Sequence, residues 1–176
     1  AEEVAGLRSV LGPSAQIASD MHWNRSAGQA ISEITEMEPH GLWFAEAPVA
    51  TEDLNGLAEI ARKVKTPIAV GEEWRTVYDA QARINARAVH IIQPEMGHTG
   101  ITQFMRMGLA AQAANLRIIP HATIGSGIFL AASLQASAAL EGIVCHEFQH
   151  SIFCRNTGLI TEGIEVENGE YRLADK

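Results

Sequence analysis

Residues 16–20 read QIASD, a short apolar run that ends on a carboxylate, and LWFAE repeats this form at residues 42–46. Four further runs continue the series: IAVGE (68–72), IIQPE (91–95), RIIPH (117–121) and GIVCHE (142–147). The six terminal residues are separated by 26, 26, 23, 26 and 26 positions. Because one strand, one helix and two short loops occupy about 25 residues, this spacing predicts successive βα units.

The runs are almost wholly apolar, which is typical of parallel strands covered by helices. Parallel βα barrels carry their reactive side chains at the C-terminal ends of the strands, where this chain has its six polar residues. We therefore expect an α/β fold of the TIM-like barrel class over residues 1–150. Residues 151–176 are expected to form an irregular tail, with a small hairpin around Asn168 and Gly169. A closed barrel has eight strands over about 250 residues, so we expect the chain to be an incomplete portion that lacks the first strands.

Composition narrows the classes of partner. The net charge of −8 and the pI near 5.3 argue against nucleic acid, because no basic field attracts phosphates. No apolar stretch approaches the roughly 18 residues that span a bilayer, so no membrane association is expected. Two cysteines, Cys145 and Cys154, are too few for a disulfide framework. We expect a cytoplasmic protein that acts on a small molecule.

Three hard oxygen ligands end three consecutive predicted strands: Asp20, Glu46 and Glu72. Adjacent parallel strands lie about 4.8 Å apart, so these carboxylates can converge on one ion. Mg²⁺ suits this set better than zinc, whose sites favour Cys and His. A single strand-end carboxylate could instead cap the next helix. Glu73 points to the other face of its strand, so the periodicity selects Glu72.

Two histidines stand at predicted strand ends or just beyond them. His121 has Glu95 one strand earlier, and a neighbouring carboxylate orients a histidine and makes it a stronger base. His22 lies two residues beyond Asp20 and is therefore on the same side of that strand end. Two proton-transfer groups around a metal suggest that one removes a proton and the other delivers one. Glu147, at the last strand end, could donate a hydrogen bond to a substrate oxygen.

These motifs resemble the C-terminal barrel of the enolase superfamily, in its mandelate racemase and muconate lactonizing enzyme branch. The segments that carry the resemblance are Asp20-Met21-His22, Glu46-Ala47-Pro48, Gly71-Glu72, Gln93-Pro94-Glu95, Pro120-His121 and Glu147. The resemblance implies a modified (β/α)7β barrel preceded by a capping domain, and commonly a homo-oligomer. It also implies abstraction of the proton α to a carboxylate, with Mg²⁺ bound by Asp20, Glu46 and Glu72.

In the same resemblance His121 is the base, Glu95 is its partner, and Glu147 donates a hydrogen bond to the developing enediolate. A histidine at the position of His22 is similar to the galactonate dehydratase-type members, where it protonates the departing β-hydroxyl. The implied reaction is dehydration of a sugar acid, an aldonate or aldarate, to a 2-keto-3-deoxy acid.

Two alternatives remain open. A racemase or epimerase on the same scaffold would need a second base opposite His121 instead of an acid for a leaving group. The second alternative is a fragment that is inactive without the rest of a longer chain, because an open sheet exposes strand edges.

Overall fold

The computed structural model describes residues 1–122, 125–151, 153–158 and 164–173. Five strands form a parallel sheet in the chain order β1-β2-β3-β4-β5, and a separate antiparallel pair joins β6 to β7. The strands are β1 (Ile17–Asp20), β2 (Leu42–Glu46), β3 (Ile68–Val70), β4 (Ile91–Ile92), β5 (Arg117–Ile118), β6 (Ile164–Glu167) and β7 (Glu170–Leu173). The helices are α1 (Glu2–Leu11), α2 (Ala27–Met37), the 3₁₀-helix η1 (Glu38–His40), α3 (Leu54–Lys63), α4 (Val77–Asn85), α5 (Met96–Ala113), α6 (Gly127–Ala138) and α7 (Phe153–Thr157). The predicted α/β alternation around a parallel sheet is confirmed.

The residues group into two compact units. The first unit comprises residues 1–70 and 82–91, and the second comprises residues 71–81 and 92–176. Among the residues that the structure describes, no helix combines the length and the apolar character needed to cross a membrane.

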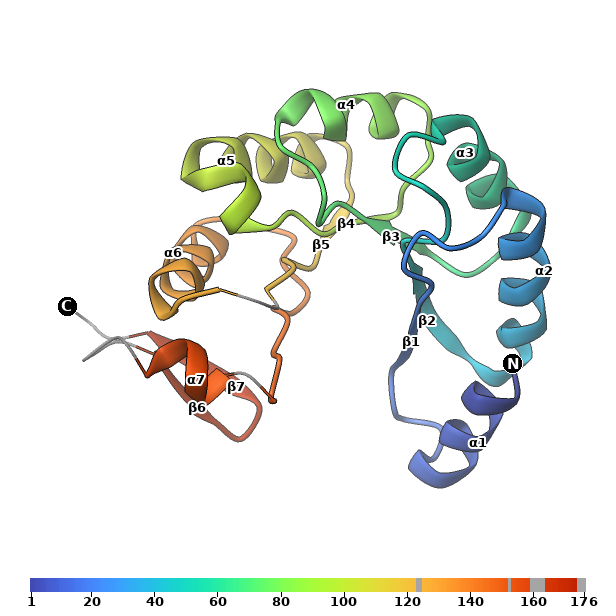
Figure 1. Cartoon of the computed structure of the whole chain (residues 1–176), viewed down its shortest axis with the longest axis horizontal. Coiled ribbons are helices and arrows are strands. Elements are labelled where there is room, and N and C mark those ends of the chain that lie inside the picture. The colour runs from blue at the N-terminus through green and yellow to red at the C-terminus, as the bar shows by residue number, and fades with distance from the viewer. Residues whose placement is uncertain (123–124, 152, 159–163, 174–176) are drawn as a thin grey trace. The chain divides into compact units, whose positions relative to one another are not determined.

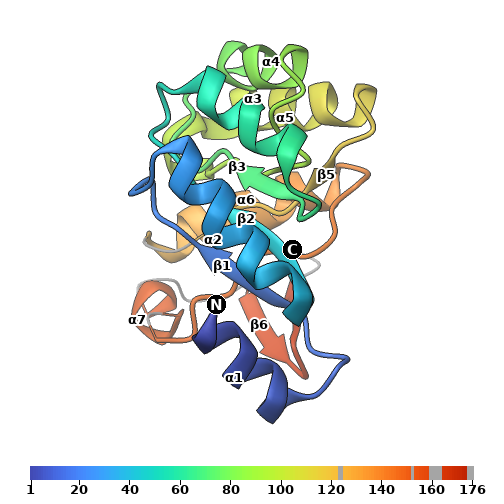
Figure 2. The same cartoon turned by 90° about the vertical axis from the view of Figure 1, so that its right-hand side faces the viewer.

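In the first unit, helices α2 and α3 lie along one face of strands β1, β2 and β3 (Figures 1 and 2). The helix α2 begins at a capping box, in which Ser26 accepts a hydrogen bond from the backbone of Gln29 and the Gln29 side chain bonds back to Ser26. Asp53 caps α3 by accepting from the N–H of Gly56. The helices bury Ile34 and Ile60 completely, so packing as well as capping fixes the helices that follow β1 and β2.

The second unit is built around α5 and α6. Met96 and Phe104 of α5 pack with Ala136 of α6 in one buried cluster. A second cluster joins Leu130 and Leu134 of α6 to the β6–β7 hairpin. The sequence predicts an irregular tail after residue 150, whereas the structure has α7 there as well as the predicted hairpin, because apolar residues from both pack on α6.

The sixth predicted strand is reduced to an isolated bridge. Ile143 pairs with Ile118, and two backbone hydrogen bonds of 3.0 Å flank this pair. Gly142 has a φ of 80°, which turns the chain just before the bridge. The following residues, 144–149, belong to neither a helix nor a strand.

Candidate active site

Strands β1 and β2 place two carboxylates side by side. Asp20 ends β1, Glu46 ends β2, and the two residues are partners in the parallel register. Partner residues of neighbouring strands point to the same face of a sheet. The N–H of Met21 donates to the carbonyl oxygen of Glu46 at 2.9 Å, which keeps the strands paired up to their last residues.

The backbone turns sharply just beyond these carboxylates. His22 and Trp23 have φ angles of 48° and 59°, and Ala47 has a φ of 44°. The N–H of Trp23 donates to the carbonyl oxygen of Ala47 at 2.6 Å, which holds the two turns together. Left-handed residues other than glycine are uncommon and gather at functional sites, because surrounding structure must compensate their strain.

His22 remains beside Asp20 after this turn. Its backbone N–H donates to Oδ1 of Asp20 at 2.9 Å, and its ring Nδ1 lies 3.9 Å from Oδ2. Within the first unit the side chains are 66% and 56% exposed, so both can reach a ligand. The first unit therefore carries a histidine and two carboxylates at adjacent strand ends.

Glu72 follows β3 after a single residue, Gly71. Glu46 is the register partner of Ala69, three residues before Glu72. Gly71, between Val70 and Glu72 in the chain, has a φ of 145°. A Cβ added to Gly71 would lie 2.8 Å from the backbone nitrogen of Gln93. Only glycine fits this close approach, and it delivers Glu72 to the strand end.

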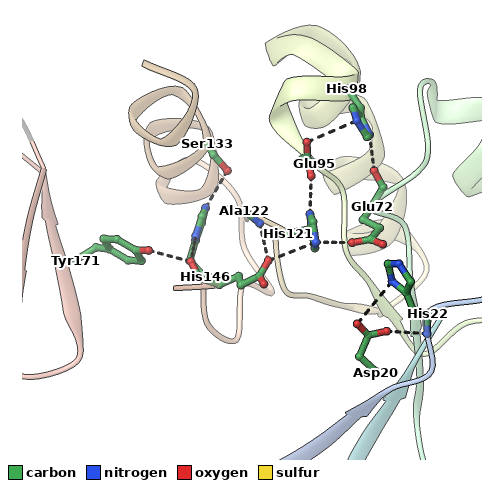
Figure 3. Close-up of polar contacts among 11 residues, drawn as sticks. Asp20, His22, Glu72, Glu95, His98, His121, Ala122, Ser133, His146 and Tyr171 are labelled. Atoms are coloured by element: carbon green, nitrogen blue, oxygen red, sulfur yellow. Dashed lines mark hydrogen bonds and ion pairs between the residues drawn. The ribbon is translucent and has the colours of Figure 1, made fainter. Parts of the chain in front are cut away.

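His121 is the centre of a polar cluster in the second unit (Figure 3). Glu95 and His121 pair in parallel register, and Oε2 of Glu95 lies 2.6 Å from Nδ1 of His121. The opposite nitrogen, Nε2, contacts Oε2 of Glu72 and lies 3.7 Å from Oε2 of Glu147. The side chains of His121 and Glu95 are each only 10% exposed.

The cluster makes the ring of His121 strongly basic. Burial alone lowers the pKa of His121, but hydrogen bonds with Glu72 and Glu95 and the charge of Glu147 raise it to about 10. The imidazolium is thus stabilised by the carboxylates around it.

Glu147 is fixed to the neighbouring chain segments although it lies outside a strand. Its carboxylate Oε2 accepts from the N–H of Ala122 at 2.7 Å, and its own N–H donates to the carbonyl oxygen of Pro120 at 3.2 Å. The two partners, Pro120 and Ala122, are the neighbours of His121 in the chain. These contacts therefore bring Glu147 close to the His121 ring.

His98 adds a contact that the spacing of strand ends does not predict. Its Nδ1 lies 2.8 Å from the carbonyl oxygen of Glu72, and its Nε2 lies 3.7 Å from Oε1 of Glu95 (Figure 3). The sequence pattern does not indicate two other residues of the network, His146 and Tyr171, because neither ends an apolar run at the repeating interval.

The paired carboxylates of the first unit suit a hard divalent cation. Asp20 and Glu46 supply carboxylate oxygens at neighbouring strand ends. In the second unit, the carboxylate of Glu72 contacts His121. Carboxylate oxygens are the ligands that Mg²⁺ prefers, usually together with water and substrate oxygens.

Residues 1–176 match the family model described as enolase C-terminal domain-like. The chain belongs to the enolase C-terminal domain-like family. The predicted relation to the enolase superfamily is thereby confirmed.

Similar proteins in this family include a dehydratase and a cycloisomerase. The chain is 35% identical over 132 residues to the D-galactonate dehydratase of Ralstonia pickettii, covering 74% of this chain and 34% of the relative. It is 27% identical over 183 residues to the D-galactarolactone cycloisomerase of Agrobacterium fabrum, covering 98% of this chain and 48% of the relative. The solved structure of a proposed isomerase from Sinorhizobium meliloti superposes with a TM-score of 0.94 at 60% identity, covering 97% of this chain and 44% of that one. The enolase-family chain thus spans about half or less of the length of these relatives.

Proposed function

We propose that this enolase-family protein, in its complete natural form, dehydrates a sugar acid to a 2-keto-3-deoxy acid. The observation that carries the proposal is the His121–Glu95 pair, a buried histidine whose Nδ1 lies 2.6 Å from a carboxylate. The sugar-acid dehydratase among the relatives supports the same reaction class.

In this proposal His121, in its neutral form, removes the proton α to the substrate carboxylate, which requires Glu72 to leave Nε2 and bind Mg²⁺ instead. Glu95 accepts the Nδ1–H hydrogen bond and so fixes the tautomer in which Nε2 is the reacting atom. Glu95 also stabilises the imidazolium that forms when the proton arrives. Glu147, on the Nε2 side of the ring, is placed to contact a substrate oxygen on which charge develops.

His22 is the proposed acid for the second half of the reaction. Its ring is exposed beside Asp20, so it can deliver a proton to the β-hydroxyl, which then leaves as water. The Cα–H and Cβ–O bonds are thereby replaced by a Cα–Cβ double bond. The resulting enol gives the 2-keto acid when a proton is added at Cβ.

Asp20, Glu46 and Glu72 would hold Mg²⁺ in this reaction. When bound, the ion supplies positive charge that favours ionisation next to the substrate carboxylate. The oxygen-only ligand set and the paired strand ends of Asp20 and Glu46 support this assignment.

We extend the proposal to the complete fold, a modified (β/α)7β barrel of which these residues form a part. The parallel sheet in chain order and the match to the family model over residues 1–176 support it. The homo-oligomer and the cytoplasmic location stay predictions.

The test is a screen of sugar acids with Mg²⁺, in which 2-keto acids are detected by a colour reaction. We expect one or more aldonates or aldarates to react, and we expect His22→Asn and His121→Asn to abolish product. The matched control is His150→Asn, an exposed histidine outside the cluster, which should react like the unchanged protein. Dehydration that persists in His121→Asn would refute the assignment of the base.

The second candidate function is an isomerase, racemase or epimerase reaction on the same scaffold. The proposed isomerase from Sinorhizobium meliloti, at 60% identity, favours it. Both candidates begin with loss of the α-proton, so both predict its exchange in D₂O. Exchange without any keto acid would select the isomerase class, whereas the absence of both signals across the library would contradict enzymatic activity of this kind.

A further inference from the structure

The segment that carries Glu147 has no strand ladder to fix it. Residues 144–149 belong to neither a helix nor a strand. A side chain that must meet a reacting atom needs a rigid support. Besides the backbone contacts of Glu147 with Pro120 and Ala122, side chains of the second unit hold its backbone carbonyl oxygen.

Two donors converge on the backbone carbonyl oxygen of Glu147. The hydroxyl of Tyr171 donates to it at 2.9 Å, and Nδ1 of His146 lies 3.0 Å from it (Figure 3). Because a carbonyl oxygen only accepts, the hydrogen of His146 must reside on Nδ1. Its Nε2 then accepts from the hydroxyl of Ser133, at 2.8 Å, so both ring nitrogens have partners.

Tyr171 comes from the C-terminal hairpin, 24 residues away in sequence. The hairpin is anchored to α6, since Tyr171 and Leu173 pack against the buried Leu130 and Leu134. The Tyr171 ring also meets His146 edge-on, with 5.5 Å between ring centroids. The packing of the hairpin on α6 thus holds the hydroxyl that contacts Glu147.

We propose that Tyr171 is a positioning residue for Glu147, whose backbone carbonyl oxygen it holds together with His146, while Ser133 holds the ring of His146. The proposal rests on the proposed role of Glu147 at the substrate. With the carbonyl oxygen held by two donors, the carboxylate is held in reach of the Ala122 N–H and of His121.

The ionisation state of Tyr171 agrees with this role. Burial and the charge of Glu147 raise the pKa of Tyr171 to about 12, so the hydroxyl keeps its proton and remains a donor at neutral pH. Tyr171→Phe removes this one donor and retains the ring that packs in the hairpin.

The test uses the amide of Ala122 as a reporter, because its N–H donates to the Glu147 carboxylate. In nuclear magnetic resonance spectra of Tyr171→Phe, we expect this amide to shift toward the position of an unbonded amide. We expect its hydrogen exchange to become about fivefold faster, as for the loss of one hydrogen bond. The matched control is Tyr78→Phe, because Tyr78 is the other tyrosine of the chain and is 79% exposed.

An Ala122 amide in Tyr171→Phe that matches the Tyr78→Phe control would overturn the proposal. If Tyr171→Phe does not fold, Ser133→Ala provides the test, because it removes the hydrogen bond that holds His146 and leaves the hairpin sequence unchanged. An Ala122 amide that is unchanged in Ser133→Ala would also overturn the proposal. In the dehydration assay, Tyr171→Phe should lower kcat more than it changes KM. If the unchanged protein has no activity, the proposed function fails, but the amide measurement still tests the positioning role.

Discussion

Gly71 shows how a single residue constrains the candidate site. Its φ is 145°, and a Cβ added at this position would lie 2.8 Å from the Gln93 nitrogen, which leaves no place for a side chain. We expect Gly71→Ala to reduce the free energy of unfolding by about 2 kcal/mol, because it adds backbone strain and a steric clash. Denaturant unfolding measures this change.

The matched control for Gly71 is Gly28, which lies in α2 and has open space around a Cβ. Gly28→Ala should stabilise the protein by up to about 1 kcal/mol, because alanine has the better helix propensity. Equal effects of the two substitutions would show that the close approach at Gly71 does not limit stability.

His146 gives a second prediction at the residue scale, one that concerns pH. Burial lowers the pKa of His146, although the hydrogen bond with the Glu147 carbonyl opposes this effect. The unfolded chain therefore binds the proton more readily than the folded one. The stabilising contribution is complete above about pH 6.5 and is lost as the pH falls below that value.

We expect His146→Gln to flatten the fall of the unfolding free energy between about pH 6.5 and pH 5. Among the described residues, Tyr171 meets the ring edge-on, and Glu147 follows His146 in the chain and contacts the ring through its backbone carbonyl oxygen. Both remain in the variant, so the difference between the two pH profiles isolates His146. The exposed His150→Gln serves as the control, and a slope unchanged in His146→Gln would contradict the assignment.

Sequence reasoning reaches some of these residues and misses others for a physical reason. The interval of 26 residues between Glu95 and His121 matches one βα unit, and the two do pair in register. Tyr171 lies in a hairpin that folds back on α6, and its approach to Glu147 depends on tertiary packing. The spacing of strand ends cannot predict that the C-terminal hairpin packs on α6 and brings Tyr171 to Glu147.

At the scale of secondary-structure elements, α2 depends on its first turn. Ser26 and Gln29 satisfy backbone N–H groups that the helix itself leaves without acceptors. We expect Ser26→Ala to lower the free energy of unfolding by about 1 kcal/mol. Ser32→Ala, on an exposed position of the same helix, should change it by less than about 0.5 kcal/mol. Thermal or denaturant unfolding distinguishes the two outcomes.

The helix α5 illustrates why element boundaries are harder to predict than elements. The helix begins at Met96, directly after the strand-end residue Glu95. Gly100 has a φ of 60° and a ψ of 170°, so it interrupts the helix and leaves a separate first turn. This first turn carries His98 toward Glu72 and Glu95, an arrangement that composition and periodicity do not reveal.

At the scale of the whole molecule, the proposed Mg²⁺ site links ligand binding to stability. A ligand that binds only the folded state at ten times its Kd raises the unfolding free energy by about 1.4 kcal/mol. We expect Mg²⁺ to raise the melting temperature and expect Asp20→Asn, Glu46→Gln and Glu72→Gln to remove this increase. Glu36→Gln is the control, because Glu36 is an exposed carboxylate on α2. An increase that survives all three site substitutions would place the ion elsewhere.

The left-handed residues beyond β1 and β2 have a consequence for sequence variation. Trp23 and Ala47 have φ angles of 59° and 44°, a region that β-branched side chains avoid and that Gly, Asn and Asp tolerate. In saturation mutagenesis, Ala47 should accept Gly or Asn more readily than Val or Ile, although valine is the nearer match in polarity. Libraries aimed at new substrates would retain more folded members if they varied the loops around these turns and kept the turns themselves fixed.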